Sequence, residues 1–206
     1  ISALHGVIEN LLDGVEEPSP EVLAGLLAQV SRLENLVAQL LDLSRLEAGV
    51  TVLEWRRVAV RRLIDEAVAA ATLGRAGTVA VTVRPRLTVD GDPERLLQVL
   101  TNLLGNALRH SPAGVPVQVT ADVADGGVLI AVTDRGPGIP EREAERVFER
   151  FFRTDGGRAA ATGGAGLGLA IARWIVDLHG GSIRVDGDHS DGCRMLVTLP
   201  RATSVS

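Results

Sequence analysis

DPERLLQVLTNLLGNALRHS, at residues 92–111, is a strong helical pattern near the middle of the chain. Asp92 is placed to cap this helix, and Pro93 occupies its first position. Asn102 and Asn106 are four residues apart, so they share one face of the helix. The apolar positions that define its buried side are Leu96, Val99, Leu100, Leu103, Leu104 and Leu108.

The polar face of this helix has groups that suit a metal bound to phosphates. An amide oxygen, as on Asn102 or Asn106, is a hard neutral ligand that can complete a Mg²⁺ shell made of water and phosphate. Arg109 and His110, about one turn further along, can contact the phosphates. The alternative is a solvated polar face on which one asparagine is satisfied locally.

A glycine-containing turn, DRGPGIP at residues 134–140, directly follows an alternating strand pattern. Its glycines let the backbone pass close to a ligand. Asp134, at the strand end, can accept hydrogen bonds from an exocyclic amine such as adenine N6. The alternative is an ordinary strand-to-helix turn that Asp134 caps.

A second glycine-rich segment, GGAGLGLAI at residues 163–171, opens a helix. Such a backbone presents unpaired N–H groups and the positive end of the helix dipole to a phosphate. The segment lacks GK[ST], so it is not a P-loop, and it follows a loop rather than a strand, which disfavours a dinucleotide-binding fold. The alternative is a flexible loop before a helix that packs closely at its glycines.

All three phenylalanines of the chain lie in VFERFFR, at residues 147–153. They either form a core plug or anchor a lid over a ligand. For at least one of them we favour the core.

The remaining patterns mix strands and helices without strict β–α–β alternation, which predicts an α+β two-layer sandwich. Strands are expected near residues 53–60, 78–83, 87–90, 116–123, 127–133, 182–187 and 193–199. Further helices are expected over residues 61–73, around 141–150 and over about 167–179.

The first 50 residues have a different organisation, which predicts a domain boundary between residues 1–50 and 51–206. ISALHGVIENLLDGVE at residues 1–16 places its apolar residues on one helical face, and EPSP follows as a turn in which Ser19 can cap the next helix. That helix runs to about Ala48 with heptad-like apolar steps. We expect an antiparallel helical hairpin that forms half of a four-helix bundle with a second copy. The alternative is a hairpin packed on its own domain.

Composition excludes several classes of function. The formal net charge is −5 and no basic run occurs among the 206 residues, which argues against a nucleic-acid partner. The single Cys193 forms no internal disulfide, which suits a reducing compartment. No apolar run approaches the roughly 18 residues needed to span a bilayer. Because the chain starts at Ile1 inside a helical pattern, we interpret it as part of a longer protein.

Taken in order, the four motifs resemble the nucleotide-binding domain of sensor histidine kinases, within the gyrase, chaperone, kinase and mismatch-repair ATPase superfamily. NLLGNALRH resembles the N box, DRGPGI the first glycine box, VFERFFR the F box and GGAGLGLAI the second glycine box. The resemblance covers about residues 54–200. It implies a Bergerat-type ATP-binding fold, in which a mixed sheet packs on three helices.

The same resemblance implies ATP and Mg²⁺ as cofactors. Asn106 would carry the Mg²⁺ with Asn102 in support, and Asp134 would read the adenine amine. Gly136 and Gly138 would form the floor of the site. The other residues that it assigns to the nucleotide are Arg109, His110, Phe148, Gly164, Gly166, Leu167 and Gly168. Residues 153–165 would be a lid that orders on binding.

The hairpin resembles the dimerisation and phosphoacceptor region of the family, with LDLSRLEAG at residues 41–49 as the end of its second helix and the hinge. The phosphoacceptor motif, HELRTP or close to it, is absent, and His5 lacks its acidic neighbour and proline. The expected reaction is transfer of the ATP γ-phosphoryl group to a histidine outside this sequence, for onward transfer to an aspartate of a response regulator. The resemblance also implies a cytoplasmic location for this part, within a protein held at the inner or plasma membrane.

Three other functions stay open at this point. An ATP-driven machine of the gyrase or chaperone type would use a Glu one turn before the metal-binding Asn, where this chain has Asn102, which cannot act as a general base. A Ser/Thr kinase of the anti-sigma-factor type is disfavoured by the hairpin. A nucleotide-binding domain without turnover would use the same residues.

Overall fold

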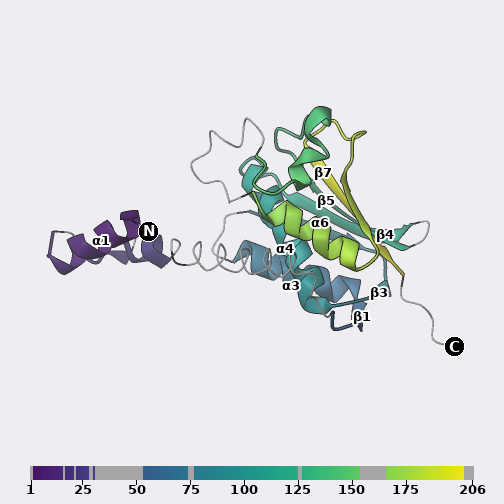
Figure 1. Cartoon of the computed structure of the whole chain (residues 1–206), viewed down its shortest axis with the longest axis horizontal. Coiled ribbons are helices and arrows are strands. Elements are labelled where there is room, and N and C mark those ends of the chain that lie inside the picture. The colour runs from purple at the N-terminus through teal and green to yellow at the C-terminus, as the bar shows by residue number, and fades with distance from the viewer. Residues whose placement is uncertain are drawn as a thin grey trace. The chain divides into compact units, whose positions relative to one another are not determined.

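The computed structural model divides the chain into two compact units, Ile1–Gly49 and Val50–Ser206 (Figure 1). The structure describes residues 2–15, 17–20, 22–27, 30, 53–73, 77–124, 127–153 and 166–201. The expected end of the second hairpin helix and the hinge at residues 41–49 lie outside these described residues. The same holds for Gly164 and for all but Arg153 of the expected lid.

In the first unit, α1 (Ser2–Leu12) ends just before Gly14, which has a left-handed φ of 71°. The hydroxyl of Ser19 then accepts the N–H of Val22 at 3.3 Å, so the predicted helix cap is confirmed. Residues 22–27 are helical. Large apolar side chains of this unit are exposed to water: Ile8, Leu12, Val15, Leu23, Leu27 and Val30.

The second unit is built on a five-stranded sheet with the strand order β2–β4–β5–β7–β6. The strands are β2 (Val79–Val83), β4 (Val117–Ala124), β5 (Gly127–Asp134), β6 (Ser182–Val185) and β7 (Cys193–Pro200). β2 and β4 are parallel and the other neighbours are antiparallel, so the sheet is mixed. Along β4, buried residues alternate with exposed ones, as expected for a strand with one face covered and the other in water.

Three helices, α3 (Val60–Thr72), α4 (Pro93–His110) and α6 (Gly168–Leu178), cover one face of this sheet (Figure 1). Their inward side chains are aliphatic, and the largest fully buried ones are Ile64, Leu96, Leu103, Leu104, Ile171 and Ile175. The core therefore lies between the helices and the sheet. The predicted α+β two-layer sandwich, a mixed sheet packed on three helices, is confirmed.

A separate two-stranded sheet precedes α4. β1 (Arg56–Ala59) pairs antiparallel with β3 (Thr88–Gly91). Asp92 follows β3 directly, and its Oδ1 accepts the N–H groups of Glu94 and Arg95 at 3.0 and 3.1 Å. The predicted cap of α4 is thus confirmed, and β3 sets the position at which this helix begins.

The helix expected around residues 141–150 is wrong. The chain instead forms two short 3₁₀ turns, η1 (Glu141–Glu143) and η2 (Arg146–Phe148). Their N–H groups reach three residues back, as from Ala144 to the Glu141 carbonyl at 3.1 Å. Glu149 then becomes extended, which ends the second turn. Apolar spacing does not distinguish two such turns from one helix, because both bring residues three apart together.

Candidate nucleotide-binding site

Asn102 connects α4 to α6. Its side-chain Nδ2 donates a hydrogen bond to the carbonyl oxygen of Gly168, the first residue of α6, at 3.1 Å. A Cβ added to Gly168 would lie 3.5 Å from the Asn102 Oδ1, so the two segments are in van der Waals contact. The structure therefore brings together two residues, 66 positions apart, that the sequence assigned to one site.

Asn106 lies one turn further along the half-exposed face of α4. Its Oδ1 accepts a hydrogen bond from Arg109 Nη1 at 3.1 Å. Among the described residues, no group of three or more His, Cys, Asp or Glu side chains can hold a metal ion. The Asn106 oxygen, a neutral hard ligand, suits a Mg²⁺ whose other ligands are phosphate and water.

Asp134 ends β5 and is only 6% exposed. Its Oδ1 accepts the backbone N–H of Gly136 at 2.8 Å. Burial raises the pKa of Asp134, and the Gly136 N–H, His110, the Cys193 N–H and His189 offset part of that rise. A buried carboxylate with spare acceptor capacity at a strand end can receive an amine from a ligand.

Two glycines allow the turn after Asp134 to approach other segments closely. A Cβ at Gly136 would lie 2.6 Å from the carbonyl oxygen of His110 at the end of α4. Gly138 has φ +72°, and its Cβ would lie 2.9 Å from the carbonyl oxygen of Gly192. The structure thus places Asp134, Gly136 and the end of α4 next to one another.

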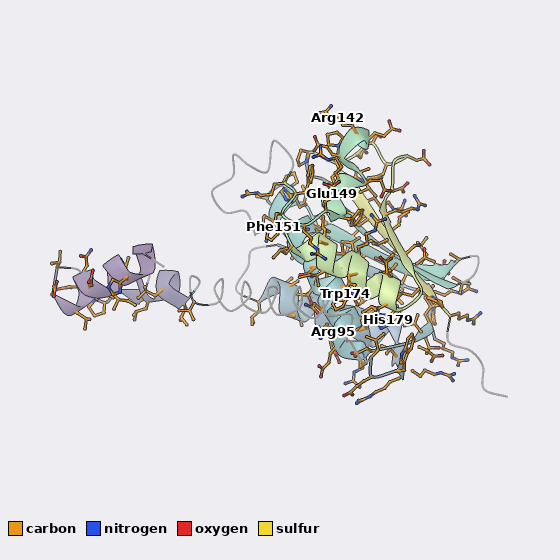
Figure 2. The ribbon with its side chains drawn as sticks, in the orientation of Figure 1. Arg95, Arg142, Glu149, Phe151, Trp174 and His179 are labelled. Carbon is orange, nitrogen blue, oxygen red and sulfur yellow. The ribbon has the colours of Figure 1, made fainter. Side chains whose placement is uncertain are left out.

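The phenylalanines have different environments. Phe148 is 6% exposed and packs under the guanidinium of Arg173, 5.3 Å from the ring centroid, so the expected core role holds for this residue. Phe151 is 61% exposed and has φ +62°, which is unusual for a bulky residue (Figure 2). Phe152 lies under Arg146, whose guanidinium carbon is 4.5 Å from the ring centroid.

Helix α6 begins at Gly168, within the second glycine box. Gly166 has φ +74°, and its carbonyl oxygen accepts the N–H of Phe151 at 3.0 Å. The Leu167 side chain is buried. Among the described residues, α6 has no side-chain cap, because its N-cap residue Leu167 makes no such hydrogen bond, so the first N–H groups of α6 can bind an anion.

Sequence reasoning predicted the hairpin of β6 and β7 but did not assign its turn, residues 186–192, to the candidate site. Arg135 pairs with Asp191 of this turn at 2.7 Å, between Nη1 and Oδ2. A Cβ at Gly192, which has φ +113°, would overlap the carbonyl oxygen of Asp134. The turn therefore borders the candidate site. Pairing of the strand that ends at Asp134 with the strand that begins at Cys193 would have placed this turn beside Asp134, and the structure has this register.

In this fold, a strand-end carboxylate, glycine turns and a helix N-terminus lie beside a helix with two asparagines, which is the arrangement expected of the ATP-binding domain. Residues 91–203 match the family model of the histidine kinase-, DNA gyrase B-, and HSP90-like ATPases. The chain belongs to this family.

Relatives within the family are sensor histidine kinases. The signal transduction histidine-protein kinase BaeS of Escherichia coli (strain K12) is 35% identical, over 97% of this chain and 44% of its own length. The sensor-like histidine kinase SenX3 of Mycolicibacterium smegmatis is 34% identical, over 97% of this chain and 53% of its own. The chain thus spans about half the length of these relatives.

A solved structure agrees with these relatives. The mycobacterial sensor histidine kinase MprB matches with a TM-score of 0.63 and 36% identity, over 71% of this chain and 97% of that one. The resemblance to sensor histidine kinases, and with it the expected ATP-binding domain of a histidine kinase, is confirmed.

Proposed function

We propose that this chain binds Mg²⁺-ATP and transfers the γ-phosphoryl group to a histidine, from which it passes to an aspartate of a response regulator. The observation that carries the binding step is Asp134, a carboxylate that is 6% exposed and oriented by the Gly136 N–H. A buried acceptor at this position suits a ligand that brings its own donor, such as the adenine N6 amine.

Each neighbouring group has a role in this proposal. Asn106 supplies its amide oxygen to Mg²⁺, and Arg109, which now donates to that oxygen, turns to the phosphates with His110. Asn102 holds the start of α6 in place through the Gly168 carbonyl. The phosphates bind the backbone at residues 164–168 and the N-terminus of α6, where Leu167 supplies no side-chain cap, over a floor of Gly136 and Gly138.

The transfer needs little covalent chemistry from the protein. A neutral imidazole nitrogen attacks the γ-phosphorus, the bond to the β,γ-bridging oxygen breaks, and ADP leaves. Mg²⁺ supplies neutralisation of the developing charge. The chain's own residues position the nucleotide, and the lid at residues 153–165 excludes water.

Hydrolysis of ATP by a gyrase-like mechanism is disfavoured. That mechanism needs a general base at the position of Asn102. The Asn102 amide cannot take a proton from water, and its Nδ2 already donates to Gly168. The arrangement therefore supports positioning of the nucleotide rather than activation of water.

We also propose that the helical hairpin of residues 1–50 forms a homodimer. The exposed apolar side chains of the first unit, among them Leu12 at 81% and Leu27 at 68%, supply surface for a second copy.

Among the described residues, no helix combines the length and apolar character needed to cross a bilayer. We place this part in the cytoplasm, within a protein held at the inner or plasma membrane.

The binding site is tested by titration with a fluorescent ATP analogue in Mg²⁺, for the wild type and for Asp134→Asn. Replacing an acceptor with a donor opposite the amine should cost about 1.5–3 kcal/mol, or roughly 10- to 150-fold in affinity. Asp122→Asn is the matched control, because Asp122 is exposed and lies on the neighbouring strand, away from Asp134.

Competable binding by the wild type and the control, with loss in a folded Asp134→Asn, supports the site. Equal binding by all three proteins rejects the role of Asp134. Phosphotransfer is then measured with a separately supplied phosphoacceptor domain and [γ-³²P]ATP. A protein that binds ATP but labels no histidine would be a nucleotide-binding domain without turnover.

A further inference from the structure

The segment before β1 contacts the rest of the second unit through two neighbouring residues. The N–H of Glu54 donates to the Asp92 Oδ2 at 3.1 Å. The Trp55 ring lies beside the His179 ring, with 5.3 Å between the centroids and 52° between the planes. Trp55 is nevertheless 54% exposed, and it follows shortly after Gly49, where the first unit ends. Residues 54 and 55, which we call the latch, can therefore come away from Asp92 and His179 without opening the core.

The His179 ring links the latch to two helices. Its Nε2 accepts the N–H of Asp92, the residue that caps α4, at 3.0 Å. Its Nδ1 lies 2.7 Å from the carbonyl oxygen of Ile175 in α6. A Cβ added to Gly91 would lie 2.8 Å from the ring, so the ring also packs closely on the backbone. A displacement of the ring must therefore move the start of α4 or the end of α6.

Helices α4 and α6 pack against each other and are tied at two places. One tie is the Asp92–His179 hydrogen bond, and the other is the Asn102–Gly168 hydrogen bond beside the candidate phosphate site. The two ties are about 15 Å apart along either helix, from the rise of 1.5 Å per residue. Since a helix is stiff over this length, a shift at the first tie reaches the second.

We propose that the latch couples the segment leading from the first unit to the nucleotide site. When docked, it holds α4 and α6 in the arrangement that binds ATP. When released, it loses the Glu54 hydrogen bond and the Trp55–His179 contact, while the Asp92 Oδ1 still caps α4. A nucleotide that prefers the docked state favours docking, and docking favours the nucleotide by the same factor. The statement about ATP rests on the proposed function, whereas coupling between the latch and α6 is a property of the ligand-free chain.

The first test measures amide hydrogen exchange by NMR in the ligand-free chain. Trp55→Ala should lower the protection of two N–H groups about five- to tenfold, that of Glu54 in the latch and that of Ile171, which donates to the Leu167 carbonyl in the first turn of α6. Trp55→Phe keeps an aromatic ring beside His179 and should retain most of the protection.

Leu73→Ala is the matched control, because Leu73 is a large apolar residue of the second unit that is 84% exposed at the end of α3. It should leave both amides unchanged. Unchanged protection of Ile171 in Trp55→Ala would overturn the proposal. An equal loss at Ile130, in the central strand β5, would show a general loss of stability and would also overturn it.

The second test uses the fluorescent ATP analogue with Mg²⁺. Trp55→Ala should bind it about five- to twentyfold more weakly than the wild type, and Leu73→Ala should bind it equally. Saturation of the wild type should raise the protection of the Glu54 N–H by the same factor within about twofold, which a merely structural residue would not do. Unchanged affinity in Trp55→Ala, or unchanged Glu54 protection in the saturated wild type, would reject the coupling. Absence of binding by the wild type would reject the proposed function, and the exchange of Ile171 in the ligand-free chain would still decide whether the latch acts on α6.

Discussion

At the scale of single residues, Gly136 marks the closest approach between the first glycine turn and α4. A methyl group there would lie 2.6 Å from the His110 carbonyl oxygen and 2.8 Å from the Asp134 Oδ1. One of these neighbours is backbone, and the other is the carboxylate that is proposed to accept a hydrogen bond from the adenine amine. A side chain at this position must therefore displace part of the site.

We expect Gly136→Ala to lower the free energy of unfolding by about 1–3 kcal/mol, because an inserted methyl strains a packed contact. Affinity for the ATP analogue should fall at least about tenfold, since the Asp134 carboxylate must move. Denaturant unfolding and the analogue titration measure the two effects. Gly187→Ala is the matched control, because nothing lies within 4 Å of its added Cβ and its φ is not left-handed. Wild-type stability and affinity in Gly136→Ala would contradict this account.

At the scale of elements, Asp92 joins the start of α4 to two other segments. Its Oδ2 accepts the N–H of Glu54, in the segment before β1, at 3.1 Å. Its own N–H donates to His179 at the end of α6, and the Trp55 ring lies 5.3 Å from the His179 ring. His179 and Phe151 are labelled in Figure 2, and they mark the two ends of α6. The helix that carries Asn106 is therefore anchored at its first turn by Asp92, more than three turns away from Asn106.

Asp92→Ala should destabilise the second unit by about 1–3 kcal/mol at pH 7, since it removes the helix cap and leaves three partly buried N–H groups without their acceptor. Glu94→Ala, in the same helical turn, removes an exposed side chain and keeps the backbone N–H that Asp92 accepts, so it should cost about 0.5 kcal/mol or less. Urea unfolding monitored by circular dichroism compares the two. Equal losses in the two variants would contradict a special role for Asp92.

Wild type and Asp92→Ala together also test how the stability that the cap provides depends on pH. Burial acts to raise the pKa of Asp92, but the N–H groups of Glu54, Arg95 and Glu94 together outweigh it, and the pKa lies below its ordinary value. A carboxyl with a lowered folded-state pKa adds stability above the unfolded value, and that stability is lost as the pH falls through the folded value. The difference in stability between wild type and Asp92→Ala should therefore be constant from pH 5 to 7 and shrink below about pH 4.

At the scale of the whole molecule, the two units differ in whether their large apolar side chains are buried or exposed to water. The second unit buries its aliphatic side chains between the helices and the sheet. The first unit exposes a series of large apolar residues within its described part. Exposed apolar surface of this kind is expected to associate in water.

We expect the chain to self-associate through the first unit, and Leu12→Lys with Leu27→Lys to make it monomeric. Each lysine places a charge on surface that the dimer would bury. Sedimentation velocity over a hundredfold concentration range measures the association. Leu73→Lys is the control, because Leu73 is 84% exposed but belongs to the second unit. A wild-type chain that stays monomeric at the highest concentration would contradict the proposed dimer.

Local sequence patterns predicted most of the second unit. The apolar spacing of residues 92–111 and the Asp92–Pro93 start match α4 within a residue or two at each end. Alternation predicted the strands at β4 and β5, and the glycines predicted a turn after Asp134. These features depend on neighbours three or four residues away, or on alternation within one strand, so the sequence alone contains them. The error at residues 141–150 arose because two 3₁₀ turns and one helix have similar local patterns.

The amino-acid sequence by itself determined the fold class, the cap of α4 and the four motifs in their order. Only the tertiary structure decided that Asn102 binds the Gly168 carbonyl, that Asp134 is buried, and that the β6–β7 turn borders the site through Asp191 and Gly192. The physical reason is the distance along the sequence over which each feature is determined. Helix and strand patterns follow from local backbone geometry, whereas these contacts depend on strand register and helix packing between segments more than 50 residues apart.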